Sequence, residues 1–236
     1  MMVVDEQWTD ALAIAAHPDD LEYGVSSALA RWTSQGKRVT QLLVTRGEAG
    51  IRSKDPETAA ALRMAEQQEA ARIVGAEAVD FLAYPDGALE YSLALRRDLA
   101  RAIRQRRPEV VVSLNFRDSW PYGESFNHVD HRMLGPAIVD AVRDAANGWM
   151  FPELVEEGLE PWGGVTSVLF SNSPKSNRYV EIGDHLEVGI RSLLAHRAYL
   201  ADLEGFDAAA YLRKDAERTG RDIGVGPAVS FERIAP

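Results

Sequence analysis

The chain has 236 residues, of which 46% are hydrophobic and 26% charged, and it contains no cysteine. This composition is typical of a globular protein with a sizeable core, and it excludes disulfides, thiolate zinc sites and cysteine nucleophiles. The net charge of −10 argues against nucleic acid and anionic membranes as partners. The N-terminus, "MMVVDEQWTD", is too acidic for a secretory signal, and no segment has the roughly 18 apolar residues of a membrane helix. We therefore expect a cytoplasmic protein.

Short apolar runs alternate with longer segments of helical periodicity in the first half of the chain. The expected strands are Ala11–Ala16, Val39–Val44, Val79–Ala83 and Val110–Leu114, and the expected helices are Val25–Gln35, Thr58–Val74 and Leu93–Arg107. Gly36, Gly75 and Pro108 follow these helices as stop signals. This alternation predicts an α/β fold, with a Rossmann-like, mostly parallel sheet flanked by helices.

The second half of the chain is less regular. A helix is expected after His131, running to about Ala146, and another from about Asp184 to Ala201. Strands are expected in "VTSVLF" and "AVSFERI". Between the first of these helices and "VTSVLF", the segment "NGWMFPELVEEGLEPWGG" is predicted to be an excursion that covers a pocket or packs against another subunit. No repeat or linker divides the chain, so residues 1–236 are expected to form a single domain.

Two clusters of histidine and aspartate follow two of the expected strands. "AHPDD" comes directly after the first strand, and "NHVDH" lies in the loop after the fourth. In a doubly wound sheet these two strands are neighbours, and the crevice at their carboxyl ends is the usual ligand site. Taken alone, the HxxD spacing is equally typical of a helix N-cap. The absence of GxGxxG after the first strand argues against dinucleotide binding.

A metal cation would offset the repulsion between the adjacent carboxylates of the first cluster. His17, Asp20 and His131 supply two nitrogens and one oxygen, which suits a catalytic zinc ion with an open coordination position. Asp19 points in another direction from Asp20 and is therefore the candidate base that accepts a proton from metal-activated water.

The remaining polar residues of the second cluster are candidates for roles around the substrate carbonyl. His128, as a cation, could stabilise a developing oxyanion or protonate a leaving amine. Asp130 could hydrogen-bond an imidazole ring and raise its pKa.

The motifs "AHPDDLEYG" and "NHVDH" resemble those of the PIG-L/LmbE-like family of zinc-dependent N-deacetylases. Supporting segments are "LLVTRGEAGIR", "RMAEQQEAARIVGA" and "YPDGAL", so the resemblance covers most of the chain, from about Leu12 to Leu203. It implies removal of the acetyl group from an N-acetylglucosaminyl compound, one zinc ion per chain and an LmbE-like fold. Relatives form oligomers, so the resemblance also allows a homo-oligomer.

Residue by residue, the resemblance implies the same zinc ligands (His17, Asp20 and His131), the same base (Asp19), and His128 as the oxyanion-stabilising residue with Asp130 as the partner of its ring. It further implies that Arg63 and Asp86 bind substrate, although Arg63 would equally suit a solvated helix face and Asp86 an ordinary turn.

The chain departs from the family pattern at two positions. Phe126 stands where some relatives have a tyrosine, and His196 lies in an element that differs from its counterpart in relatives. Tyr122 lies near Phe126 in the sequence, but no spacing argument brings it to the site. His185 is expected at the surface.

Four functions remain open from the sequence. The first is zinc-dependent deacetylation of an N-acetylated amino sugar, and the second is amidase action on an aminosugar thiol conjugate. The third is a non-haem iron oxygenase, because two histidines and one carboxylate also describe its metal triad. The fourth is a non-catalytic metal-binding module. Iron and cobalt are alternatives to zinc at such a site.

Overall fold

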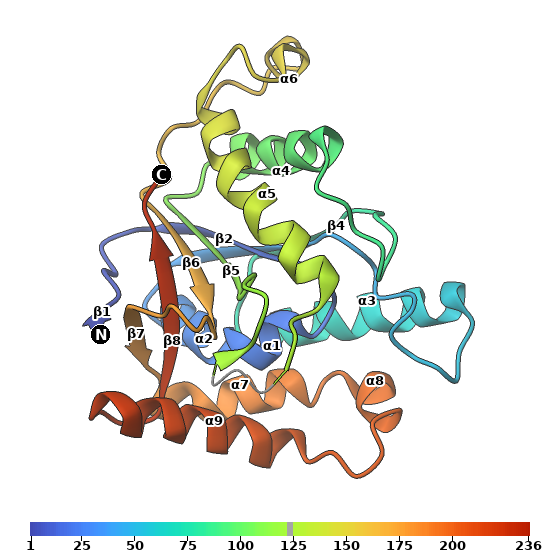
Figure 1. Ribbon diagram of the computed structural model, residues 1–236, viewed down its shortest axis with the longest axis vertical. Coiled ribbons are helices and arrows are strands. Elements are labelled where there is room, and N and C mark those ends of the chain that lie inside the picture. Colours follow the sequence, from blue (N-terminus) through green and yellow to red (C-terminus); the bar gives the residue numbers. More distant parts are fainter. Residues whose placement is uncertain (122–124) are drawn as a thin grey trace.

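The computed structural model describes residues 1–121 and 125–236 and has one mixed sheet with helices on both faces (Figure 1). Its described strands are β1 (Met2–Val3), β2 (Asp10–Ala15), β3 (Arg38–Leu43), β4 (Ala78–Phe81), β5 (Val110–Leu114), β6 (Ser167–Ser171), β7 (Arg178–Glu181) and β8 (Ala228–Ile234). They are ordered β1-β7-β8-β6-β5-β2-β3-β4. The pairings of β8 with β6 and β7 are antiparallel, whereas the other described pairings are parallel. The predicted fold class is therefore confirmed.

The central strand β2 separates two hydrophobic cores, because successive side chains of a strand point to opposite faces. Ala11, Ala13 and Ala15 belong to the core on one face, and Leu12 and Ile14 to the core on the other. All five side chains are almost fully buried. A strand buried on both faces reads as a continuous apolar run, which is why this element could be recognised in the sequence.

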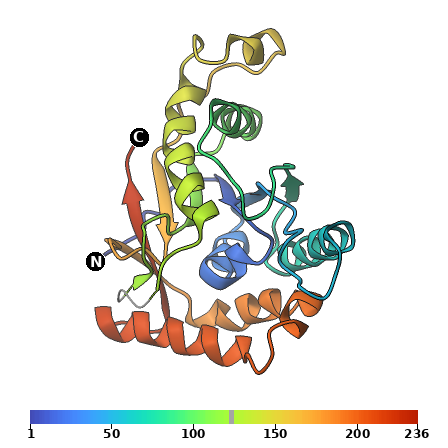
Figure 2. The same cartoon turned by 45° about the vertical axis from the view of Figure 1, so that its right-hand side comes forward.

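The helices divide between the two faces of the sheet (Figure 2). They are α1 (Asp20–Gly24), α2 (Ser26–Ser34), α3 (Pro56–Ile73), α4 (Leu93–Arg106), α5 (Val129–Ala146), α6 (Pro152–Glu156), α7 (Leu186–Leu193), α8 (Arg197–Ala201) and α9 (Ala208–Ile223). Side chains of α1, α2, α7 and α9 enter the core with the alanines of β2. Side chains of α4 and α5 enter the other core.

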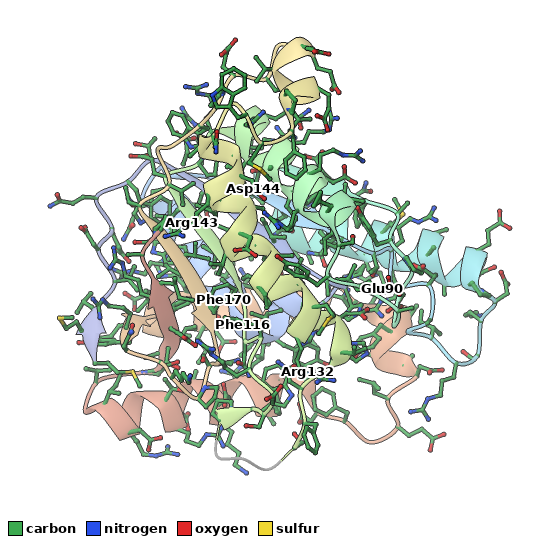
Figure 3. All side chains as sticks on the ribbon, turned by 45° about the horizontal axis from the view of Figure 1, so that its top comes forward. Glu90, Phe116, Arg132, Arg143, Asp144 and Phe170 are labelled. Carbon is green, nitrogen blue, oxygen red and sulfur yellow. The ribbon has the colours of Figure 1, made fainter. Side chains whose placement is uncertain are left out.

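Strands β2 and β5 are neighbours, as the doubly wound arrangement predicts, with Ala11 opposite Val110. The loop after β5 is held beneath α5, where Phe116 packs against Phe170 with ring centroids 4.5 Å apart (Figure 3). Gly135 makes this approach possible, because a Cβ there would fall 2.2 Å from the Cβ of Phe116. The first turn of α5 is thereby brought to the carboxyl ends of β2 and β5.

Helix α2 confirms the expected helix Val25–Gln35, whereas the short helix α1 before it was not predicted, and the backbone of Val25 (φ −135°) separates the two. Two predicted helix boundaries were wrong. Helix α5 begins at Val129, so His131 lies in its first turn instead of before it. The helix expected from about Asp184 to Ala201 consists of a 3-10 turn, α7 and α8, because the chain turns inward at His196, whose side chain is fully buried.

Helix α9 and the short strands β1 and β7 were not predicted. For α9 the sequence did carry signals: the Asp207 side chain accepts a hydrogen bond from the Ala210 amide at the N-terminus, and Gly224 ends the helix in a left-handed conformation (φ 78°). Strand β1 has two residues, too short for a periodic pattern, and β7 has four.

The aromatic excursion after α5 projects at the end of that helix opposite α1 and α9 (Figure 1). Phe151 is buried in the core beside α4 and α5, and the Trp162 indole donates a hydrogen bond to the Pro108 carbonyl. Trp149 is 91% exposed. The expectation that this segment covers the pocket was therefore wrong, and contact with another subunit stays a prediction. Within the described ranges, every helix is too short or too polar to cross a bilayer.

Candidate active site

The three predicted metal ligands come together at the carboxyl end of the sheet. The loop after β2 supplies His17 and Asp20, and the first turn of α5 supplies His131. The Nδ1 atom of His17 lies 3.4 Å from Asp20 Oδ2, and Nε2 of His131 lies 3.0 Å from Asp20 Oδ1. One potential ligand atom from each residue lies within 4.8 Å of the others. The geometry suits a shared cation between two imidazoles and a carboxylate.

The other ring nitrogen of each histidine faces an acceptor. His17 Nε2 lies 2.9 Å from Asp130 Oδ2, and His131 Nδ1 lies 2.9 Å from Asn127 Oδ1. Each acceptor orients its ring, so that His17 Nδ1 and His131 Nε2 are left to face Asp20. Metal-binding histidines in proteins are held in this way.

The charges around His17 also fit a cation. Burial alone would lower the pKa of His17, but Asp20, Asp130 and Asp86 raise the pKa well above its usual value. Burial would likewise raise the pKa of Asp20, but His131 and His17 hold it well below its usual value. Three carboxylates therefore gather around one buried ring. Burying three carboxylates together costs free energy unless a positive charge compensates for their repulsion, and a divalent cation would supply that charge.

Asp19 lies beside this group, with its carboxylate directed toward α3. Its Oδ1 atom is 2.9 Å from a guanidinium nitrogen of Arg63, and both side chains are buried. Burial raises the pKa of Asp19 to about 6, Arg63 opposes the rise, and Asp20 adds to it. A carboxylate with a pKa near neutrality can both accept and return a proton, as a general base requires.

Arg63 was predicted to bind substrate or to lie on a solvated helix face, and the second alternative is wrong because the residue is 3% exposed. Its guanidinium stacks on Tyr199, 4.4 Å from the ring centroid, and donates a hydrogen bond to the Pro18 carbonyl. Gly50 leaves room for it, since a Cβ there would fall 1.8 Å from Arg63 Nη1. The side chain lines the pocket, and its charged partner is Asp19.

Asp86 lies in the pocket wall, as a residue that meets substrate should. It accepts a hydrogen bond from the Ala49 amide (2.8 Å), and its Oδ1 is 3.1 Å from His17 Nε2. If Asp86 binds sugar hydroxyls as predicted, the same carboxylate also contacts His17, a candidate metal ligand.

The expected pairing of Asp130 with the ring of His128 was wrong. The Asp130 carboxylate instead accepts hydrogen bonds from Gly87 N (2.7 Å) and Leu89 N (3.0 Å) and contacts His17. His128 is the N-cap of α5, and its Nδ1 accepts a hydrogen bond from the Asp130 amide (3.2 Å). This assigns the proton of a neutral His128 ring to Nε2.

The expected positive charge on His128 is not favoured either. Burial lowers the pKa of this ring, and neighbouring His17 lowers it further. His128 nevertheless lines the pocket, so its Nε2 can serve as a neutral hydrogen-bond donor.

The remaining residues singled out from the sequence have mixed outcomes. His185 is at the surface, with Nε2 3.0 Å from Ser34 Oγ, whereas His196 is fully buried next to Glu22. Phe126 is 86% exposed. Tyr122 lies outside the described residues.

A pocket of about 1010 Å³ opens above the metal-ligand candidates and extends to α9 and β8. One wall carries Tyr23, Tyr199 and Tyr211, and the far end includes Ile223 and Ser230. Because α9 was not predicted, the sequence gave no indication that Tyr211 and Ile223 line the pocket. The volume is at the upper end of the range for pockets that hold drug-sized ligands.

The chain matches known proteins over most of its length. It is 30% identical over 203 residues to the diacetylchitobiose deacetylase of Thermococcus kodakarensis, covering 83% of this chain and 73% of that protein. A 1D-myo-inositol 2-acetamido-2-deoxy-alpha-D-glucopyranoside deacetylase of Saccharopolyspora erythraea is 30% identical over 191 residues, with 70% and 66% covered.

The structure is similar to that of the N,N'-diacetylchitobiose deacetylase from Pyrococcus horikoshii. The TM-score is 0.88 at 27% sequence identity, and the match covers 98% of this chain and 85% of that chain. Residues 12–142, more than half of the chain, match the sequence model of a deacetylase family, and this segment contains all the metal-ligand candidates. The chain therefore belongs to the GlcNAc-PI de-N-acetylase (PIG-L) family.

Proposed function

We propose that the protein is a zinc-dependent deacetylase that hydrolyses the acetamide of an N-acetylated amino sugar and releases acetate. The observation that carries the proposal is the position of Asp19, a buried carboxylate with a pKa of about 6, next to the group formed by His17, Asp20 and His131. Relatives named as deacetylases of N-acetylated sugars support a hydrolase over an iron oxygenase.

The residues present fit a zinc ion held by His17, Asp20 and His131. When bound, zinc would polarise the amide carbonyl and make water more acidic. Iron or cobalt could occupy the same ligands, so the choice of zinc is part of the proposal.

The protein side chains carry the proton transfers. Asp19 accepts a proton from water as the water oxygen bonds to the amide carbon. The carbon–nitrogen bond then breaks, and Asp19 returns the proton to the leaving nitrogen. The second proton of the water leaves the new carboxyl group and is taken up by the amine, so that acetate and a protonated amine are formed. His128, through Nε2–H, donates a hydrogen bond to the oxygen that gains negative charge.

The size of the pocket supports a substrate that extends beyond the reacting amino sugar. Its volume of about 1010 Å³ and its tyrosine-bearing wall offer room and apolar surface for a second ring or a conjugated group. A cytoplasmic location and a homo-oligomeric state stay predictions from the sequence.

The test is acetate release by zinc-loaded protein from N-acetylglucosamine, N,N'-diacetylchitobiose and N-acetylglucosaminyl-inositol. We expect chelation to abolish release and zinc to restore it. Asp19→Asn should bind zinc normally and lose roughly 10²- to 10⁴-fold in kcat. Asp80→Asn is the matched control, because Asp80 is a surface carboxylate paired with Arg106. Absence of acetate across the panel, or full activity of Asp19→Asn, would contradict the proposal.

A further inference from the structure

The candidate base Asp19 has an unusual backbone. Its φ is 93° and its ψ −24°, in the left-handed region that side chains with a Cβ disfavour. This conformation directs the carboxylates of Asp19 and Asp20 to different partners: Asp19 contacts Arg63, and Asp20 contacts the two histidines. Something in the structure must hold the backbone there, since Asp19 makes no side-chain cap to its own helix.

Two residues of α3, one helical turn apart, contact Asp19 from the same side. Arg63 pairs with its carboxylate at 2.9 Å, and the side-chain oxygen of Gln67 accepts a hydrogen bond from its backbone N–H at 2.9 Å. Gln67 is fully buried. Residues four apart on a helix share a face, so α3 holds both the side chain and the backbone of the candidate base.

The orientation of the Gln67 amide is fixed by its other contacts. Its Nε2 donates hydrogen bonds to Glu22 Oε1 (3.2 Å) and Gln41 Oε1 (3.0 Å). A flipped amide would set an NH₂ group against the Asp19 N–H and an oxygen against the Glu22 carboxylate. The network therefore allows only the arrangement in which Gln67 accepts from Asp19.

Glu22 is itself held from several sides. Its Oε1 accepts hydrogen bonds from Ser26 Oγ (3.2 Å) and Ser192 Oγ (3.3 Å), and His196 Nε2 lies 3.4 Å from Oε2. Glu22 is 2% exposed, and Ser192 and His196 are fully buried. Through Gln67 and Glu22, the candidate base is therefore connected to a buried polar network that includes His196, for which the sequence suggested no role.

We propose that Gln67 is a positioning residue that keeps Asp19 in the left-handed conformation required for proton transfer. The inference rests on the proposed function, because it takes Asp19 as the base. Without Gln67, the buried N–H of Asp19 loses its acceptor, and the backbone is free to relax to negative φ. The carboxylate would then turn away from the position set by Arg63.

The test compares Gln67→Met with Gln68→Met, the same substitution at the neighbouring exposed position of α3. For Gln67→Met we expect kcat to fall roughly 10- to 100-fold, as small misplacements of catalytic groups do. We expect KM to change less than about twofold and bound zinc per chain to stay as in the wild type. Gln68→Met should match the wild type in all three measurements.

A double-mutant comparison separates positioning from general damage. In the Asp19→Asn background, Gln67→Met should cause no further loss, because the residue acts only through the base. If Gln67→Met does not fold, Gln67→Asn replaces it, since its shorter amide stays polar but no longer reaches Asp19.

The outcomes distinguish this inference from the proposed function. An unchanged kcat in Gln67→Met, a loss of bound zinc with activity, or an additive loss in the double variant overturns the role of Gln67 while wild-type deacetylation stands. Failure of the wild type to release acetate from any substrate overturns the proposed function itself.

Discussion

Replacing Arg63 by methionine should move the pH dependence of kcat to higher pH. Asp19 must be ionised to accept a proton, so activity rises as pH rises through the pKa of this carboxyl group, which is about 6. Arg63 lowers that pKa from a distance of 2.9 Å. A neighbouring arginine typically lowers the pKa of an aspartate by about 1–3, so the loss of Arg63 should raise the pKa of Asp19 by a comparable amount.

The expected change in rate follows from the ionised fraction. At pH values below both pKa values, kcat should be about 10- to 10³-fold lower in the variant, the factor that corresponds to a pKa higher by about 1–3. The loss should disappear once the pH exceeds the pKa of Asp19 in the variant. A bound cation lowers the pKa of Asp19 in both proteins, so the measured quantity is the difference between the two profiles.

The assay is acetate release at saturating substrate between pH 5 and 10. Arg72→Met is the matched control, because Arg72 is on the same helix with a side chain that is 73% exposed. Arg63→Lys should shift the profile less than Arg63→Met, since it keeps a positive charge. A raised KM with an unshifted kcat profile would refute this reasoning and favour the substrate-binding role that the family resemblance implies.

Three further predictions concern the metal centre and the fold. Asp130→Ala should weaken zinc affinity about 10- to 100-fold, measured by competition with a chelator, because it frees the ring of His17; unchanged affinity would exclude this orienting role. Arg104→Met should lower the free energy of unfolding by about 3 kcal/mol in urea titrations, because the buried guanidinium of Arg104 donates hydrogen bonds to backbone carbonyls at the end of α5. The control is Arg97→Met, at a side chain that is 41% exposed, and its free energy of unfolding should stay within about 0.5 kcal/mol of the wild type. Ser92→Ala should cost about 1 kcal/mol by removing the N-cap of α4, and equal urea midpoints would count against that cap.

The meeting of the two histidine clusters could be predicted because it depends on topology alone. His17 follows β2 and His131 follows β5, and the carboxyl ends of neighbouring parallel strands share one edge of the sheet. The partner of Asp130 could not be predicted in this way. It depends on α5 beginning at Val129, which turns the Asp130 carboxylate toward the amides of Gly87 and Leu89.

The burial of Arg63 could not be predicted from the sequence for a related reason. A helical pattern gives the face on which a residue lies, but here the depth is set by a loop from another part of the chain, which passes close to Arg63 at Gly47 and Gly50. The same limit applies to Gln67, a polar residue that periodicity alone would not assign to the core. Its partners Glu22 and Gln41 come from α1 and β3.

The pocket described above draws on two parts of the chain. The residues proposed for chemistry lie between positions 17 and 131, inside the segment 12–142 that matches the family's sequence model. The pocket residues Tyr211 and Ile223 of α9 and Ser230 of β8 lie outside that segment. A substitution at these positions is therefore expected to change the space beside the proposed substrate while the side chains proposed for chemistry stay in place.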